Sequence, residues 1–129
     1  MGISKLDEQR VRISKIAYFH GTASVYKAIT EVVPSNPDHP DFRVGHTLAA
    51  DYAHWRRVKR GLPARYRLFY RFSTRPAKII VHAWLNDEAT LRKAGAKTDV
   101  YAVFGKMLAR GEVPSDIEDL KKWSRDLGE

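Results

Sequence analysis

Two neighbouring segments of this chain have the side-chain pattern of β-strands and are separated by only a few residues. Residues 65–72 (RYRLFYRF) alternate in character, which is the two-residue period of a half-buried strand. Residues 78–85 are mostly apolar and β-branched, which is typical of a buried strand. Because so short a connection joins antiparallel neighbours, the two segments predict a hairpin. In the first strand one face carries Tyr66, Leu68, Tyr70 and Phe72, and the other carries Arg65, Arg67, Phe69 and Arg71.

The region before the hairpin predicts one more strand and one helix. Gly61 and Pro63 supply a turn that joins residues 65–72 to an earlier strand near residues 55–59, which gives a three-stranded antiparallel meander. Apolar residues recur at three- and four-residue steps from about residue 7 to residue 33, and this period predicts a helix. We expect the helix to end at Pro34, because the residue before a proline avoids the helical region.

The region after the hairpin predicts helices. We expect a short helix over residues 87–94, a longer one that begins near Asp99 and ends before Gly111, and a further short one over residues 117–127. The order of helix, small antiparallel sheet and C-terminal helices predicts an α+β fold. The length of 129 residues predicts a single domain over residues 1–129.

The positive charge is concentrated in the centre of the chain. The formal net charge is +8, and no acidic residue occurs between Asp51 and Asp87, where there are nine basic residues, seven of them arginine. A long segment of one sign repels itself unless a partner neutralises it, and arginine suits bidentate contacts to phosphate. The segment therefore predicts a nucleic acid or another polyanion as partner, with an ordinary solvated basic face as the alternative.

Several classes of protein are excluded or disfavoured. The absence of cysteine excludes disulfides, thiolate catalysis and cysteine-bound metal centres. The longest apolar run, residues 79–85, is too short to span a membrane, and the first ten residues lack the apolar core of a signal peptide, so we expect a cytoplasmic protein. No histidine has metal-ligand spacing, and we expect neither a metal nor a cofactor. His46 and His54 flank the basic segment and are candidates for histidine-based ribonuclease chemistry or for plain surface residues, whereas His82 is expected in the core.

Two sets of residues are candidates for chemistry on phosphate. Arg65 and Arg67 alternate on one strand face, so their backbones lie about 6.5–7 Å apart and both side chains can reach one RNA strand. Lys97 and Tyr101 lie near the start of the long C-terminal helix, and Tyr101 is off the strongest apolar stripe of that helix. A phenol, a lysine and an arginine can share proton transfer and phosphate stabilisation without a metal. The alternatives are a solvated strand face for the arginines and a packing role for the tyrosine.

A resemblance to the YhaV toxins extends over residues 24–116. It rests on RYRLFYRF (65–72) and on WLNDEATLRKAGAKTDVYAVFGKMLARG (84–111) followed by Pro114, with NPDHPDFRVGHTL (36–48) and HWRRVKRG (54–61) fitting the same pattern. YhaV toxins are the toxin halves of PrlF–YhaV toxin–antitoxin modules in the RelE/ParE superfamily. The resemblance implies an mRNA interferase, a small α+β ribonuclease that cleaves RNA without a metal, often during translation, and arrests growth. It also implies a cognate antitoxin of the PrlF type, with an AbrB-like fold.

The resemblance also ranks the candidate site residues. Arg67 matches the arginine of the Y-R-L-x-Y strand motif, Arg57 and Lys59 match basic residues of the preceding strand, and Lys97 and Tyr101 match a basic-x-x-x-Tyr element. The implied chemistry is attack of a ribose 2′-hydroxyl on the adjacent phosphate, which yields a 2′,3′-cyclic phosphate. Arg67 would stabilise the transition state, Lys59 and Lys97 would act as base, acid or charge, and Tyr101 would orient the nucleotide or move a proton. The implied RNA contacts are Arg57, Arg65 and Arg71.

One departure from the family keeps alternatives open. YhaV toxins usually carry a longer N-terminal part, with a strand and a helix ahead of the helix that ends near Val33, and MGISKLDEQRVR does not match that part. We therefore expect a shortened N-terminal part, in which the strand that completes the sheet is missing, through degradation of the toxin or a misplaced start, or the sheet is completed in a different way. The alternatives are a truncated, catalytically inactive member that binds RNA or its antitoxin, and a gyrase-poisoning toxin of the ParE type. The basic residues and the tyrosine favour the nuclease over the gyrase poison.

Overall fold

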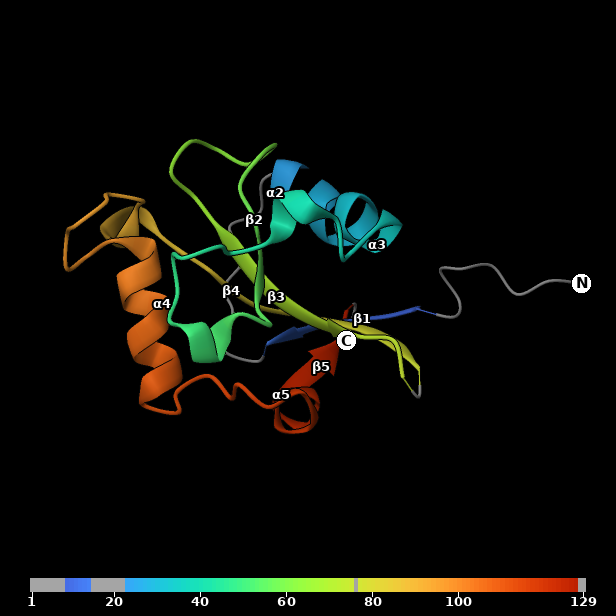
Figure 1. The fold of residues 1–129 in the computed structure, drawn as a ribbon. Coiled ribbons are helices and arrows are strands. Elements are labelled where there is room, and N and C mark those ends of the chain that lie inside the picture. Colours follow the sequence, from blue (N-terminus) through green and yellow to red (C-terminus); the bar gives the residue numbers. More distant parts are fainter. Residues whose placement is uncertain (1–8, 15–22, 76, 128–129) are drawn as a thin grey trace, which may run out of the picture.

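A five-stranded mixed sheet forms the centre of the molecule (Figure 1). The computed structural model describes residues 9–14, 23–75 and 77–127. The sheet has the order β2-β3-β4-β1-β5, where β1 runs parallel to β4 and all other neighbours are antiparallel. The strands are β1 (Gln9–Ser14), β2 (Arg56–Val58), β3 (Leu68–Ser73), β4 (Lys78–Leu85) and β5 (Ser124–Asp126).

Helices lie on both faces of this sheet (Figure 1). One face is covered by a continuous helical segment made of α2 (Ala23–Lys27), a π-helical turn (Ala28–Val32) and α3 (Val33–Ser35). The other face is covered by α4 (Val100–Ala109) and, next to β1 and β5, by α5 (Ile117–Trp123). Short 3-10 turns occur at Pro40–Phe42, Ala50–Tyr52 and Glu88–Thr90. No helix among the described residues is long and apolar enough to cross a membrane.

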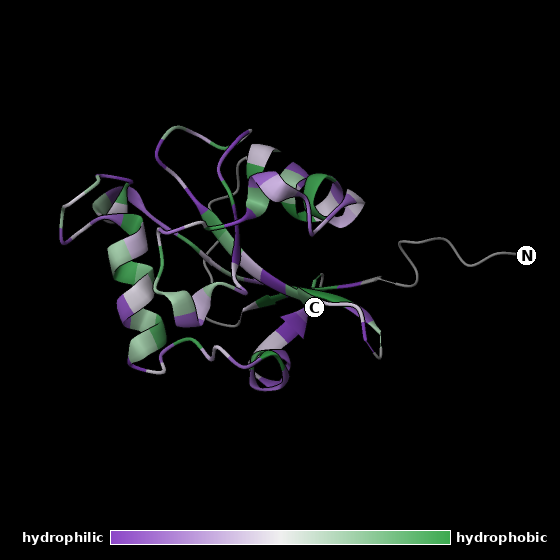
Figure 2. Cartoon of the chain, viewed as in Figure 1, coloured by the Kyte–Doolittle hydropathy of each residue, from purple (hydrophilic) through white to green (hydrophobic). Residues whose placement is uncertain are grey.

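The core has two layers, one on each side of the sheet. On the α4 side, Phe104 packs against Phe69, with ring centres 4.1 Å apart, and against Trp84 and Trp55. On the other side Val33 packs in a cluster with Leu68, Tyr70 and Ile80. In Figure 2 the central strands are mostly hydrophobic, whereas β5 and the long loops are mostly hydrophilic. Both faces of β3 are therefore covered, and Phe69 is a core residue rather than a ring available for base stacking.

A bulge in β4 changes which face its last residues point to. Tyr70 pairs with His82 but Phe69 pairs with Trp84, so β4 has one extra residue at Ala83. As a result Ala83 and Trp84 both belong to the α4 side, and Leu85 joins Leu68 on the other side. Bulges of this kind re-aim a strand end. Here the re-aimed end leads directly to Asn86, which organises the site described below.

The hairpin and meander are confirmed in their topology, but β3 begins at Leu68, so Arg65 and Arg67 precede the strand and do not alternate on its face as expected. The N-terminal prediction is also corrected. Residues 9–14 form a strand in place of the expected helix, and pairing of β1 with β4 makes the sheet mixed rather than purely antiparallel. The strand expected to be missing is thus supplied by Gln9–Ser14, where Val11 and Ile13 alternate with Arg10 and Arg12. The helical prediction is confirmed from residue 23, and residues 7–8 and 15–22 lie outside the described residues.

Two helix ends also differ from expectation. Pro34 does not end the helix at Val33, because α3 continues to Ser35, and the fixed φ of proline is compatible with a first helical turn. The helix expected over residues 87–94 is only the 3-10 turn Glu88–Thr90, which Asp87 caps in a reciprocal capping box. The residues after this turn form neither a helix nor a strand as far as Asp99. This irregular backbone path places Arg92 in the site.

Candidate active site

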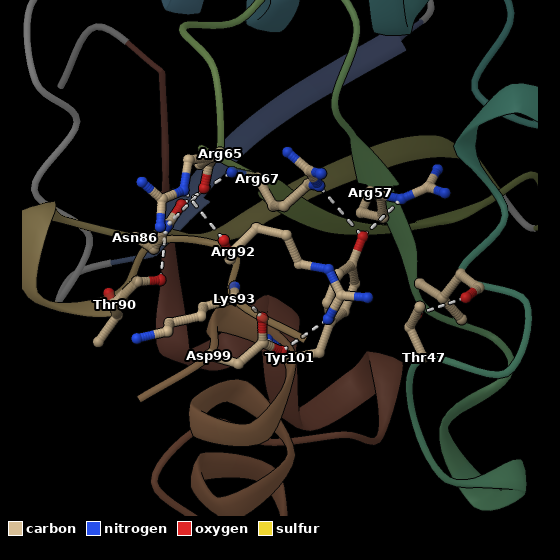
Figure 3. Close-up of polar contacts among 11 residues, drawn as sticks. Thr47, Arg57, Arg65, Arg67, Asn86, Thr90, Arg92, Lys93, Asp99 and Tyr101 are labelled. Atoms are coloured by element: carbon tan, nitrogen blue, oxygen red, sulfur yellow. Dashed lines mark hydrogen bonds and ion pairs between the residues drawn. The ribbon is translucent and has the colours of Figure 1, made fainter. Parts of the chain in front are cut away.

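Tyr101 is the centre of a polar cluster at the start of α4. Asp99 caps this helix, and its carboxylate accepts a hydrogen bond from the backbone N–H of Tyr101 at 3.1 Å. The Tyr101 ring stands edge-on to Phe69, with ring centres 5.6 Å apart, and only 5% of the residue is exposed. The core therefore fixes the ring and leaves its hydroxyl at the edge of the sheet (Figure 3).

Three arginines converge on Tyr101 from three different segments (Figure 3). The Nε atoms of Arg57 on β2 and of Arg67 before β3 donate to the Tyr101 hydroxyl oxygen, at 2.9 and 3.3 Å. The guanidinium of Arg92 lies over the Tyr101 ring, 4.8 Å from its centre, which is a cation–π contact. We call Arg57, Arg67, Arg92 and Tyr101 the arginine–tyrosine cluster.

The cluster has donors left for an anion. Arg57 also donates to the carbonyl of Asp41 at 2.6 Å, and Arg67 to the carbonyl of Tyr66 at 2.8 Å. Among the described residues, neither Arg57 nor Arg67 uses its Nη2 atom in a hydrogen bond. Since the Tyr101 oxygen accepts two N–H groups, its own proton is available to a third partner. Two guanidinium groups bonded to one phenol oxygen, with a free phenol proton, are donors of the kind that bind the oxygens of a phosphate.

Asp99 is the carboxylate that pairs with Arg92. Its side chain accepts from Arg92 at 2.9 Å and from the backbone N–H of Lys93 at 2.6 Å. Burial favours the neutral acid, but the hydrogen bonds from Lys93, Arg92 and Tyr101 and the charge of Arg92 outweigh it and hold the pKa of Asp99 below its ordinary value. The ionised Asp99 therefore fixes Arg92 in place, while Arg57 and Arg67 are held through carbonyl groups and the phenol.

Asn86 connects the segments that carry the arginines. It is fully buried, and its side-chain oxygen accepts from the backbone N–H of Arg67 at 2.8 Å. Its side-chain nitrogen donates to the carbonyls of Thr90 at 2.8 Å and of Arg65 at 3.3 Å. Arg65 has a φ of 73°, which is the left-handed region, and two bonds between Arg65 and Arg92 hold it there. A non-glycine residue in this conformation is typical of a constrained functional loop.

The remaining predicted residues lie at different distances from the cluster. Lys97 is exposed and lines a wide cavity of about 660 Å³ that Arg92 and Tyr101 also line. His46 and Lys106 line the same cavity, whereas His54 does not. Lys59 is not in this cavity but lines a smaller one on the other side of Arg57.

Two of the predicted RNA contacts are engaged elsewhere. Arg65 is exposed, and its Nε atom donates to the carbonyl of Arg92. Arg71 bonds the carbonyl of Ser115 on the far side of the α4 layer, and burial lowers its pKa. The structure thus brings Arg57, Arg67 and Tyr101 together, sets Lys97 beside them, and places Arg71 apart.

Arg92 and Asn86 were not among the sequence-based candidates. Arg92 lies in a stretch where a helix was expected, and Asn86 lies between the expected strand and that helix, so neither was marked by a site motif. The only available signal was the acid-poor LRKAGAK run itself. Among the described residues, no group of three or more histidine, aspartate or glutamate side chains is placed to hold a metal ion.

The proteins to which this chain is similar are toxins. The family model described as "Toxin with endonuclease activity, of toxin-antitoxin system" matches residues 7–125. The chain is 48% identical over 101 residues to the "Ribonuclease toxin YhaV" of Escherichia coli (strain K12), covering 78% of this chain and 64% of that protein. It is 50% identical over 99 residues to the "Toxin YhaV" of Escherichia coli O6:H1 (strain CFT073), covering 76% and 63%.

The matches differ in how much of each protein they cover. The match spans less than two thirds of the length of the curated relatives. No solved structure matches the chain. The family model, in contrast, covers almost all of it, including β1, the arginine–tyrosine cluster and α5. The chain belongs to the YhaV toxin family.

Proposed function

We propose that this chain is an endoribonuclease, the toxin of a type II toxin–antitoxin system, and that it cleaves RNA at the arginine–tyrosine cluster. The observation that carries the proposal is the convergence of Arg57 and Arg67 on the Tyr101 hydroxyl with unused donors. Such a group of fixed cations is costly to hold in a fold unless it meets an anion. Membership of a family described by endonuclease activity supports a phosphodiester as that anion.

The chemistry follows from the donors. The ribose 2′-oxygen attacks the adjacent phosphorus and loses its proton to solvent, while the bond from phosphorus to the 5′-oxygen breaks. Arg67 and Arg57 bind the two non-bridging oxygens, where negative charge increases in the transition state. Tyr101 donates its proton to the departing 5′-oxygen and regains one from water. The products are a 2′,3′-cyclic phosphate and a free 5′-hydroxyl, and no step uses a metal or cofactor.

The cations around the cluster bind the rest of the RNA strand. Arg92 adds charge directly over the Tyr101 ring, and Lys97 with Lys106 lines the wide cavity beside it. We assign this cavity to a neighbouring backbone phosphate. Lys59 provides charge on the opposite side, and Arg65 and Arg71 are peripheral contacts. Lys59 and Lys97 thus act by charge rather than as acid or base.

The proposal extends to partners. A type II toxin is neutralised by a cognate antitoxin protein, which here would be of the PrlF type with an AbrB-like fold. Messenger RNA is the substrate, with ribosome association as one mode of access, and the cytoplasm is where such a nuclease acts. The family description names a toxin–antitoxin system and supports this proposal in its general form.

The test is cleavage of an end-labelled mRNA in EDTA, with and without translating ribosomes. Arg67→Ala and Tyr101→Phe should each reduce the cleavage rate about 100-fold, as loss of one transition-state donor does. Arg110→Ala, at the opposite end of α4 and largely exposed, is the matched control and should cleave normally. Binding without cleavage by the unchanged protein would identify an inactive RNA-binding member. DNA damage on expression with intact translation would identify a gyrase poison.

A further inference from the structure

A second cavity lies on the other side of Arg57 from Tyr101. Its volume is about 250 Å³, and it is formed where the end of α3, the 3-10 turn Pro40–Phe42 and the residues after β2 meet. We call it the Phe42 cavity. It is lined by Val32, Ser35, Asn36, His39, Asp41, Phe42, Lys59 and Arg60.

Arg57 connects the Phe42 cavity to the arginine–tyrosine cluster. Its Nε atom donates to the Tyr101 hydroxyl at 2.9 Å, and its Nη1 atom donates to the carbonyl of Asp41 at 2.6 Å. Asp41 lines the cavity, and Lys59 follows Arg57 by two residues in the chain. Arg57 is therefore bonded both to Tyr101, which lines the wide cavity, and to Asp41, which lines the Phe42 cavity.

The walls of the Phe42 cavity suit a flat heteroaromatic ring. The Phe42 ring is held edge-to-face by Tyr70 and by His39, each with ring centres 5.9 Å apart. Neighbouring Val32 and the ring make this wall apolar, which is what stacking of a base requires. The wide cavity differs, because Arg92 already covers the Tyr101 ring on that side.

The same cavity carries groups that read base edges. Asn36 offers an amide, with both donors and an acceptor, and Asp41 a carboxylate. The Nδ1 atom of His39 accepts from the backbone N–H of Asp41 at 3.1 Å, so the neutral ring carries its proton on Nε2 and can donate. Lys59 and Arg60 place positive charge at the same cavity, where the phosphate attached to a bound nucleoside would lie.

We propose that the Phe42 cavity binds the base of one of the two nucleotides that flank the scissile phosphate, and so sets the base preference of cleavage. Phe42 supplies the stacking surface, Asn36 and His39 read the edge of the base, and Lys59 binds its phosphate. This inference rests on the proposed nuclease function. An apolar peptide is a poorer occupant, because two cations and a carboxylate line so small a volume.

The test uses short oligoribonucleotides that contain each of the sixteen dinucleotide steps within constant flanks. The cleavage rate of each is measured for the unchanged protein and for Asn36→Ala, Asn36→Asp and Phe42→Leu. Phe42→Leu keeps an apolar contact to Tyr70 but removes the flat ring, and circular dichroism checks its fold. His54→Ala is the control, since His54 is exposed and lines neither cavity.

Asn36→Ala should reduce the preference for one base, at one position beside the cut, about tenfold, as loss of a contact to a base edge does. Asn36→Asp should shift the preference toward a base with a donor edge, and Phe42→Leu should slow cleavage of the preferred step most. Equal slowing of all sixteen steps, or an unchanged preference in the Asn36 variants, would overturn the inference while leaving the nuclease proposal intact. Absence of cleavage by the unchanged protein would overturn both.

Discussion

His82 gives this protein a specific sensitivity to acid. The imidazole lies in the middle of β4, fully buried beside the Tyr70 ring, with ring centres 5.5 Å apart. Neither ring nitrogen forms a hydrogen bond with any described residue. Because the charged form would be desolvated there, burial lowers the pKa of His82 from 6.5 to about 3.

The effect on stability follows from proton linkage. Above pH 6.5 the histidine is neutral in both states and contributes no pH dependence. Below pH 6.5 the unfolded chain takes up a proton that the folded protein refuses until pH approaches 3, so the free energy of unfolding decreases as pH falls. Relative to pH 8, the loss attributable to His82 is about 2 kcal/mol at pH 5 and about 3 kcal/mol at pH 4. For a small domain with a stability of about 5–15 kcal/mol this is a substantial fraction.

Urea unfolding of the unchanged protein and of His82→Leu, at pH 8 and pH 5, measures this loss. Carboxylates titrate in the same range, but their contribution is common to both proteins and cancels in the difference. We expect the unchanged protein to lose about 2 kcal/mol more than His82→Leu between the two pH values. His54→Leu, at an exposed position, should keep the full loss. Equal pH dependence in the unchanged protein and His82→Leu would show that the imidazole is solvated or paired and would refute the argument.

Three further substitutions test what holds the fold and the site together. Arg12→Met should lower the free energy of unfolding by about 2 kcal/mol in urea at low salt, because Arg12 binds Asp126 at 2.7 Å and two groups of Ser124 in a setting that solvent partly screens. Asn86→Ala should cost about 2–3 kcal/mol and reduce RNA cleavage at temperatures where the variant stays folded, since it leaves the Arg67 N–H without its acceptor. Phe104→Ala should cost about 3–5 kcal/mol in the same unfolding assay, because the ring is fully buried among other aromatic rings.

The parts of the fold with a local signal could be predicted from the sequence. The period-two pattern of residues 65–72 and the apolar run 78–85 gave the central hairpin, and the bounds of β4 agree with the prediction. The Asp99 cap and the apolar stripe after it predicted α4. In each case the residues that decide the structure lie within one element, so periodicity and capping are sufficient.

The two strands β1 and β5 have no local sequence pattern that decides their structure. β1 is paired in parallel with a strand more than sixty residues away, and β5 is only Ser124–Asp126. Arg12 links the two through its bonds to Ser124 and Asp126, so β5 depends on a side chain on β1. Val11 and Ile13 did alternate with arginines, but the helical spacing of Ile13 with later residues competed with that pattern. Long-range pairing decided between the two interpretations, and a sequence window does not contain it.

In the candidate site, too, some residues could be predicted from the sequence and others could not. Arg67 and Tyr101 were predicted because their residue types suit phosphate chemistry, and Arg57 was predicted from the resemblance to the YhaV toxins. The structure brings both arginines within hydrogen-bond distance of the Tyr101 hydroxyl. Arg92 and Asn86 could not be found, because they act through an irregular segment whose path depends on the β4 bulge, on the left-handed Arg65 and on the buried amide itself. Their contribution is to geometry, which no local pattern records.

The distribution of partners explains how the fold keeps three guanidinium groups around one phenol. Among the described residues, Arg92 is bonded to a carboxylate, the ionised Asp99, whereas Arg57 and Arg67 are held by the carbonyls of Asp41 and Tyr66 and by the Tyr101 oxygen. Carbonyl and phenol groups satisfy N–H donors without cancelling their charge. A second carboxylate in their place would stabilise the fold but would compete with a phosphate for the same donors. The arrangement keeps the cluster positive and oriented before the proposed RNA substrate binds, which is what stabilisation of a developing negative charge requires.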